Sequence, residues 1–308
     1  MPIVAANGID LCYDEVGDAK APVILLIMGL GTQMIAWPDA FCFALAQRGF
    51  RVVRFDNRDI GLSTKIENAA PVDLIAAFAR AMAGESVEAP YALDDMAADT
   101  VGLVDALRIS RAHMIGASMG GMIAQIVAAR YADRARSLTS IMSSSGAPGL
   151  PQGRPEAISA LLSPRPPSGD RESVIREGVR ILRIIGSPGF PTSDAELRAK
   201  VERAADRSYY PPGVGRQMLA ILASGSRVEL LKEIKVSTLV IHGADDPLVP
   251  VEAGTDTAKH IPGAALKIIP GMGHDLANGL VPILVDAIAD HCLAADRQLK
   301  SMAMRQGQ

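Results

Sequence analysis

The stretch "AHMIGASMGGMIAQIVAARYA", residues 112–132, decides the fold. Its first six residues have the apolar character of a buried strand, and the residues from Met119 onward have that of a helix. Ser118 stands between them, with Gly116 before it and Gly120 and Gly121 after it. Glycine weakens strands and helices alike, so glycines on both sides of the serine indicate that another group approaches the backbone at this turn.

Short strand-like runs alternate with helical patterns along the rest of the chain. An alternating strand is expected over 9–16, buried strands over 22–28, 51–55 and 237–243, and further strands over 137–143 and 265–271. Helical spacing marks 36–49, 95–107, 119–131 and about 276–294. The alternation predicts an α/β fold with a mostly parallel central sheet flanked by helices on both faces.

The region 146–228 interrupts this alternation. It contains the proline- and glycine-rich runs "SPRPPSGD", "GSPGFPTSD" and "YYPPGVG", and the helical patterns "ESVIREGVRILRII" and "GRQMLAILASG". We interpret it as a helical cap inserted into a core made of 1–145 and 229–308. Ligands of open α/β sheets bind at the carboxyl ends of the strands, where such a cap would wall a pocket. The alternative is a helical insertion that only extends the core.

Composition excludes several classes of partner. The formal net charge is −3 and only 4% of residues are aromatic, which argues against nucleic-acid binding. Cys12, Cys42 and Cys292 have no metal-ligand spacing and are expected to be reduced thiols of a cytoplasmic protein. The first residues have no signal-peptide pattern, and the run "PVILLIMGLG" is about half as long as a membrane span, so no membrane association is expected.

Residues 116–120 fit the pattern G-x-S-x-G in a strand–turn–helix context, which predicts a nucleophile at Ser118. Such a turn strains the serine backbone, exposes the hydroxyl above the sheet, and requires small residues two positions before and after it. The N–H groups of the following helix favour negative charge at the same point. A phosphate-binding loop is the alternative, but its pattern needs a lysine that is not near, and a dinucleotide-binding turn would belong to the first strand.

A serine hydroxyl needs a base. Of the five histidines, His113, His242, His260 and His291 lie in predicted strands or helices, where packing or exposed positions are expected. His274 instead lies in the glycine-rich loop "PGMGHDLANG" after the last strand, and this loop can carry its imidazole over the sheet to the serine. The alternative is a histidine of an exposed loop.

The acid should lie between serine and histidine in chain order. The segment "IHGADDPLVP" supplies Asp245 and Asp246 directly after a buried strand. Asp246 precedes a proline, which favours an extended conformation at the start of the loop, so we assign the acid to Asp246 and expect Asp245 to be an exposed turn residue. The other usual place for the acid, "IMSSSGAPG", has no carboxylate.

The oxyanion hole is expected from two backbone N–H groups. One belongs to Met119, after the nucleophile, and the other to Leu30, in the Gly-Leu-Gly turn that follows the strand over 22–28. Gly29 and Trp37, near the same turn, are candidates for the substrate pocket.

The motifs "GASMGG", "HGADD" and "GMGH" resemble, in order, the nucleophile, acid and histidine motifs of the α/β-hydrolase superfamily. Met28 stands where many relatives have histidine. The segment "RFDNRDIGLS" is similar to the family's D-x-R-G-x-G-x-S segment, with Asp59 in place of a glycine. By this resemblance Asp56 and Arg58 are supports of the oxyanion loop. The chain is also similar to capped bacterial esterases of the aclacinomycin methyl esterase type.

These patterns predict a serine hydrolase that cleaves a small-molecule carboxylic ester, largely apolar, through an acyl-enzyme. No cofactor or metal is implied, and a homo-oligomer is compatible with the sequence. A lactonase, a carbon–carbon bond hydrolase or a perhydrolase could use the same residues, and a non-catalytic ligand-binding member of the fold is the alternative of another class. Epoxide hydrolases and haloalkane dehalogenases have aspartate where this chain has Ser118.

Overall fold

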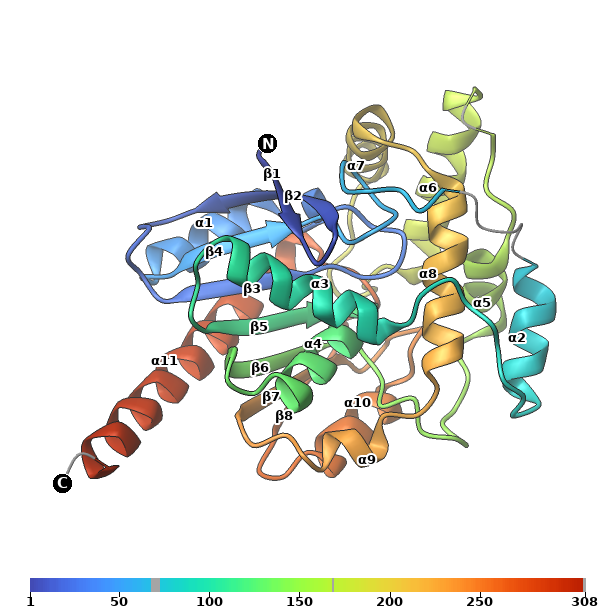
Figure 1. Ribbon diagram of the computed structural model, residues 1–308. Coiled ribbons are helices and arrows are strands. Elements are labelled where there is room, and N and C mark those ends of the chain that lie inside the picture. Colours follow the sequence, from blue (N-terminus) through green and yellow to red (C-terminus); the bar gives the residue numbers. More distant parts are fainter. Residues whose placement is uncertain (68–72, 168, 307–308) are drawn as a thin grey trace.

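The structure is a computed structural model that describes residues 1–67, 73–167 and 169–306 (Figure 1). Its eight strands form one sheet in the order β1-β2-β4-β3-β5-β6-β7-β8. The strands are β1 (Ile3–Ala6), β2 (Ile9–Val16), β3 (Val23–Ile27), β4 (Arg51–Phe55), β5 (Ala112–Ala117), β6 (Ala135–Ile141), β7 (Ser237–Gly243) and β8 (Ala265–Ile269). Two pairings, β1 with β2 and β2 with β4, are antiparallel and the other five are parallel, so the predicted mostly parallel sheet is confirmed.

Helices cover both faces of the sheet. On one face lie α1 (Asp39–Gln47) and α11 (Val281–Gln306), whose apolar residues join β3, β5, β6 and β7 in one core cluster. The other face carries α3 (Leu93–Ala106), α4 (Met119–Arg130), α9 (Val228–Leu231) and α10 (Val251–His260). Strands β3 and β5 are buried along their whole length, as continuous apolar runs require when helices cover both faces.

The C-terminal helix α11 extends beyond the sheet, at the lower left of Figure 1. By length and composition alone, its stretch Asn278–Ser301 could cross a membrane, the one such helix among the described residues. Its first half, however, buries Leu284, Val285 and Ile288 against the sheet. The first half of α11 is therefore a helix of the core.

Five helices gather at the carboxyl ends of the strands, at the right and top of Figure 1. Four of them lie between β6 and β7: α5 (Pro155–Leu162), α6 (Arg171–Ile185), α7 (Asp194–Arg207) and α8 (Pro211–Ser224). We call 146–227 the helical segment. The fifth, α2 (Leu74–Met82), contacts α8, and the sequence reading did not identify it. Asp73, which caps α2 by accepting from the Ala76 N–H, was the available signal.

The expected cap ends at residue 228, inside α9. Because α9 contacts α4 and α10, it belongs with the helices that cover the sheet. The chain therefore leaves the helical segment shortly before α9. Strand β1 was also not identified; it forms a hairpin with β2 through Asn7 and Gly8, both at positive φ.

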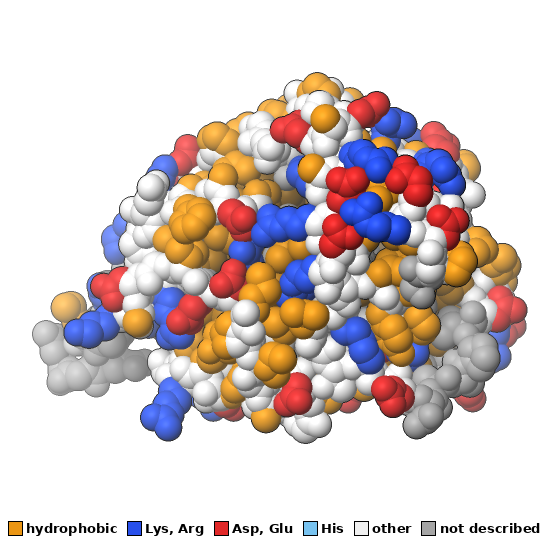
Figure 2. All heavy atoms as spheres, turned by 90° about the horizontal axis from the view of Figure 1, so that it is seen from above, with side chains coloured by type: hydrophobic (Ala, Val, Ile, Leu, Met, Phe, Trp, Pro, Cys, Tyr) orange, Lys and Arg blue, Asp and Glu red, His pale blue; other side chains and the backbone are white. Residues whose placement is uncertain are grey.

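Opposite charges alternate over α6 and α7, where blue and red side chains gather in Figure 2. Arg198 pairs with Glu172 at 2.8 Å, and Arg171 pairs with Asp206 at 2.8 Å. These four side chains are exposed, and exposed ion pairs contribute about 0–1 kcal/mol each. Both pairs join α6 to α7, so they do not attach the helical segment to the sheet.

Candidate active site

Ser118 has a backbone conformation that few non-glycine residues adopt, with φ 55° and ψ −121°. Its N–H donates to the carbonyl of Ile141 in the neighbouring strand β6, at 2.9 Å. Its carbonyl accepts from the Gly121 N–H at 2.9 Å and from the Ser143 hydroxyl at 2.8 Å. Such strain costs about 1–3 kcal/mol and persists only where the surroundings determine it, as these hydrogen bonds do here.

The glycines around Ser118 are required by close backbone contacts. A Cβ on Gly116 would lie 2.0 Å from the carbonyl oxygen of Gly120, and a Cβ on Gly120 would lie 2.0 Å from that of Ile27. Helix α4 thus starts directly against β3 and β5. A side chain at either position would push α4 away and turn the serine hydroxyl from its place.

Ser118, His274 and Asp246 form one hydrogen-bonded chain. His274 Nε2 lies 3.0 Å from Ser118 Oγ, and His274 Nδ1 lies 2.7 Å from Asp246 Oδ2. An ionised carboxylate only accepts, so Nδ1 carries the proton and Nε2 is free to accept from the serine hydroxyl. The structure thus brings His274 next to Asp246, 28 positions away in the sequence, and next to Ser118, 156 positions away.

Asp246 is fully enclosed and remains an anion. Burial alone would raise its pKa, but the charge of His274 and hydrogen bonds from His242, His274 and the Val249 N–H hold the pKa below its usual range. Oδ1 also accepts from the Leu248 N–H at 2.9 Å. The carboxylate is therefore both fixed in direction and charged at neutral pH.

His242 is close to this acid, which the sequence reading did not anticipate. Its Nε2 lies 2.8 Å from the Val249 carbonyl and 3.5 Å from Asp246 Oδ2. The ring is fully buried, and a Cβ on Gly254 of α10 would lie 2.3 Å from its Nδ1. Its place at the end of β7, four residues before Asp246, was the available signal.

The turn after β3 comes close to Ser118. A Cβ on Gly29 would lie 3.1 Å from Ser118 Cβ, so only glycine fits there without displacing the serine. Within 1–67, 73–167 and 169–306, no protein acceptor lies opposite the N–H of Leu30 or of Met119. Both groups therefore stay candidates for the oxyanion hole.

Asp56 and Asn57 hold the two ends of this turn. Asp56 Oδ1 accepts from the Met34 N–H at 2.8 Å, and Asn57 Nδ2 donates to the Met28 carbonyl at 2.9 Å. Arg58, in contrast, reaches α3, where it forms a buried bidentate pair with Asp99. Its side chain is directed to α3. Its link to the turn is through its backbone carbonyl, which accepts from the Gln217 amide.

The loop that carries His274 is attached to the helical segment. The His274 N–H donates to the Ile185 carbonyl at 2.7 Å, and the Gly189 N–H donates to the Gly271 carbonyl at 2.9 Å. Ser187 Oγ accepts from the Gly273 N–H at 2.8 Å and donates to Asp275, whose pKa burial raises. The residues between α6 and α7 thus fix the backbone on both sides of the imidazole.

Asp245 contributes to the same loop. It is only partly exposed, and its Oδ2 accepts from the Gly271 N–H at 2.8 Å. The expected solvent-exposed turn residue is therefore a link between the loop of Asp246 and that of His274. Asp246, the next residue, makes the contact with the His274 imidazole.

Trp37 does not join this group. It is fully buried, stacks on Phe41 with ring centroids 5.3 Å apart, and belongs to the core cluster under β3 and β4. It directly follows the short helix Met34–Ala36, whose residues Met34 and Ile35 are also buried. The tryptophan has no exposed surface to offer a substrate.

The remaining histidines are held by the fold. His113 is buried beside Ser137 at 2.8 Å, and His291 faces the Leu138 carbonyl at 3.2 Å. His260 contacts the carbonyl of Asp256 in its own helix, at 2.9 Å. None of these three histidines is hydrogen-bonded to Ser118.

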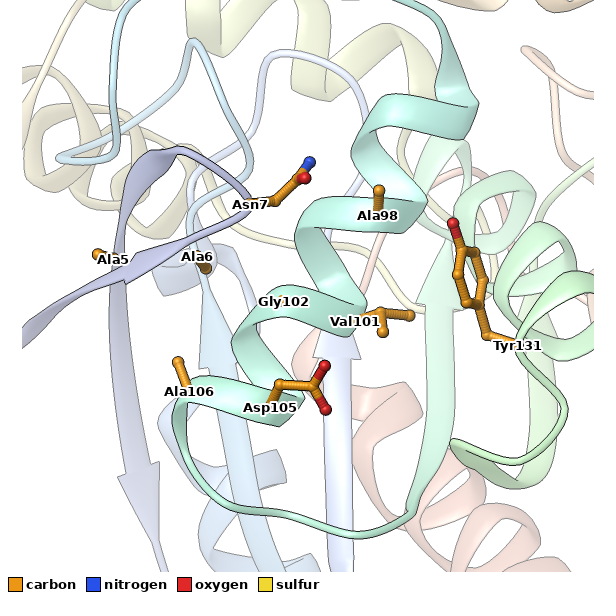
Figure 3. Close-up of a pocket in the computed structure, with 9 residues that line it drawn as sticks. All are labelled: Ala5, Ala6, Asn7, Ala98, Val101, Gly102, Asp105, Ala106 and Tyr131. Carbon is orange, nitrogen blue, oxygen red and sulfur yellow. The ribbon is translucent and has the colours of Figure 1, made fainter.

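A shallow hollow of about 480 Å³ lies between β1 and the C-terminal half of α3 (Figure 3). Small side chains line most of it, with Asn7, Asp105 and Tyr131 at its edges. Asp105 is already paired with Arg134 at 2.9 Å. None of the lining residues is a nucleophile beside a base, so this hollow has no arrangement like that of Ser118, His274 and Asp246.

Comparison with known proteins agrees with this geometry. A profile described as "alpha/beta hydrolase fold" matches residues 22–162. A poly(3-hydroxyalkanoate) depolymerase of Ectopseudomonas oleovorans is 31% identical over 203 residues, 64% of this chain and 67% of that protein. The chain belongs to the α/β-hydrolase family. The predicted family and fold are thereby confirmed.

Other relatives match over nearly the whole length. A rhodomycin D methylesterase of a Streptomyces species is 26% identical over 311 residues, covering 95% of this chain and 98% of that protein. Among solved structures, a meta-cleavage product hydrolase of Pseudomonas fluorescens has a TM-score of 0.74 at 22% identity, covering 96% and 98% of the two chains. An enol-lactonase of Burkholderia xenovorans has 0.71 at 24%, covering 94% and 99%. These two structures share the fold.

Proposed function

We propose that Ser118, His274 and Asp246 are the catalytic triad of a carboxylic ester hydrolase. The observation that carries this proposal is the hydrogen-bonded chain from Asp246 through His274 to Ser118 Oγ. The protein is an ester hydrolase of the α/β-hydrolase family, as its match to the methylesterases over 95% of its length indicates. The roles of the individual residues follow from their positions.

In the first half-reaction, His274 Nε2 removes the Ser118 proton while Oγ attacks the ester carbonyl carbon. The N–H groups of Leu30 and Met119 stabilise the oxyanion of the tetrahedral intermediate. The imidazolium then protonates the leaving alkoxide, which departs as the alcohol. Asp246 keeps the imidazole oriented and compensates its positive charge.

In the second half-reaction, water takes the place of the alcohol. His274 removes a proton from the water, which attacks the acyl-enzyme carbonyl. The intermediate collapses, Ser118 Oγ leaves with the proton from His274, and the carboxylic acid is released. The enzyme returns to its starting state, and the net reaction is ester plus water giving acid plus alcohol.

The helical segment acts as a cap over the triad, and the ester it encloses is largely apolar. One contact supports this: the apolar side chain of Val214 in α8 packs beside Gly31, in the turn next to Ser118. The methylesterase relatives favour a methyl or other small alkyl alcohol, with the larger part of the substrate on the acyl side. Cytoplasmic location and self-association stay predictions from the sequence.

The test is hydrolysis of p-nitrophenyl esters from acetate to decanoate, and of methyl esters of apolar acids, by wild type and Ser118→Ala. We expect activity that peaks at one acyl length and falls by about three or more orders of magnitude in the variant. A fluorophosphonate should label wild type and not Ser118→Ala. Full activity in Ser118→Ala would overturn the mechanism.

Labelling without ester hydrolysis would instead assign the same triad to another bond. Lactones and vinylogous diketones would then be assayed in place of open-chain esters. Absence of both labelling and hydrolysis would indicate a non-catalytic member of the fold.

A further inference from the structure

The Leu30–Gly31 peptide, in the turn after β3, contacts helix α8. The Gly31 N–H donates to Oε1 of Gln217, at 2.8 Å, across 186 residues of sequence. A Cβ on Gly31, whose φ is 64°, would lie 3.0 Å from the Val214 side chain, one helical turn before Gln217. Helix α8 therefore supports the turn by both a hydrogen bond and packing.

The direction of the Gln217 amide is determined. Its Nε2 donates to the Arg58 carbonyl at 2.8 Å, and the residue is fully buried. A flipped amide would place NH₂ against the Gly31 N–H and Oε1 against the Arg58 carbonyl, so both contacts would become repulsive. Gln217 thus joins the turn after β3 to the loop after β4 in one arrangement.

Helix α8 is itself fixed at the adjacent residue. Arg216 forms two hydrogen bonds of 2.8 Å with the Asp59 carboxylate, and both side chains are buried. Tyr91 also donates to Asp59, at 2.7 Å, and a Cβ on Gly213 would lie 2.1 Å from the Asp59 carbonyl oxygen. Gln217 therefore projects from a helix that cannot shift relative to the loop after β4.

We propose that Gln217 is a positioning residue for the oxyanion hole, which rests on the proposed function. By holding the Gly31 N–H, Gln217 fixes the Leu30–Gly31 peptide and so the direction of the neighbouring Leu30 N–H. Oxyanion stabilisation depends on donors that are in place before charge develops. Loss of Gln217 leaves the triad intact and lets the Leu30 donor move.

The experiment compares Gln217→Met and Gln217→Glu with wild type. Methionine has nearly the same length but no hydrogen bonds, and glutamate keeps an acceptor for the Gly31 N–H. Ser137→Ala is the control, because it removes a buried hydrogen bond to His113 near the start of β6. Measured quantities are kcat and KM on the best ester, Ki for a trifluoromethyl ketone analogue of that ester, rate of fluorophosphonate labelling, and Tm.

For Gln217→Met we expect kcat about 10- to 100-fold lower, KM within about 3-fold of wild type, and analogue affinity reduced in parallel with kcat/KM. Gln217→Glu should retain more kcat than Gln217→Met even where its Tm is lower, a result that a purely structural role does not give. Ser137→Ala should lower Tm with analogue affinity unchanged.

Wild-type kcat and analogue affinity in Gln217→Met would overturn the proposal, as would a loss of kcat that simply follows Tm across all three variants. If Gln217→Met does not fold, Gln217→Glu tests the proposal. This variant keeps the acceptor for the Gly31 N–H, so it should retain substantial kcat, and loss of its kcat would overturn the proposal. A wild type that neither hydrolyses esters nor reacts with the fluorophosphonate would overturn the proposed function, and this inference with it.

Discussion

The backbone N–H of His274 donates to the carbonyl of Ile185, at 2.7 Å. Ile185 ends α6, so this carbonyl is one that the helix itself leaves without a partner. The position of the imidazole is therefore set by the helical segment as well as by β8. A substitution between α6 and α7 should therefore alter the position of the proposed base, His274, without contacting its imidazole.

Gly189→Ala should lower activity through this contact. Its new Cβ would lie 2.7 Å from Gly271 Cα, which forces the His274 loop away from Ser118. We expect kcat to fall by about 10-fold with little change in KM, since displacements of about 1 Å can cost 100-fold. Steady-state kinetics measures this.

Gly169→Ala is the matched control, because a Cβ there has open space around it. It should have the kcat of wild type. Equal kcat in both variants would show that the segment does not influence His274.

Asp246→Asn should lower kcat by about 10⁴-fold, because an amide cannot hold the imidazole in the required tautomer or compensate its charge. The side chain keeps its size, so the fold should survive. In a triad that acts as a unit, losses do not add. The double variant with His274→Ala should thus be no slower than His274→Ala alone; multiplied losses would argue against a shared step.

Asp59→Asn should destabilise the protein by about 3–5 kcal/mol in urea unfolding, because it leaves the buried Arg216 without a counter-charge. Asparagine tolerates the positive φ of 69°, so backbone strain is held constant. Arg216→Met in the Asp59→Asn background should recover much of the loss. A cost under about 1 kcal/mol would show that water or another group replaces the carboxylate.

Stability should fall as the pH drops from 6.5 to about 4. Burial lowers the pKa of His291 to about 4, and the Leu138 carbonyl only partly offsets this. Between the unfolded and folded pKa values the unfolded chain binds a proton that the native chain does not, so acid favours unfolding. The loss from this group is up to about 3 kcal/mol, complete at the folded pKa.

Urea midpoints at pH 7.5 and 4.5 test this assignment. His291→Gln, which can still donate to Leu138, should lose less stability than wild type over that interval. His260→Gln on α10 is the control for the loss of a histidine outside this contact. Parallel curves for all three proteins would assign the loss to other groups.

The three candidate residues could be expected at one place because each lies at the end of a strand. Ser118 follows β5, Asp246 follows β7 and His274 follows β8, so a parallel sheet places them at one edge. The positions of these residues along the chain, relative to the strands, are enough for this expectation, and the packing of side chains does not have to be known. The same logic identified the turn after β3.

Supporting residues could not be predicted in this way. Gln217 and Ser187 act through the placement of helices on the sheet, which the local sequence does not specify. Trp37 illustrates the opposite error: it is near the oxyanion turn in sequence, yet it is buried in the core. Asp245 was expected in solvent because its hydrogen-bond partner, Gly271, belongs to another loop.

The attachment of the helical segment at both Gln217 and Ile185 limits how the chain can be recombined with its relatives. A helical segment transplanted from another hydrolase would bring different pocket residues for a different ester. It would also have to place one acceptor opposite the Gly31 N–H and another opposite the His274 N–H. Substrate range in this lineage should therefore change by single substitutions on the inner faces of α6 and α8 more readily than by exchange of whole modules.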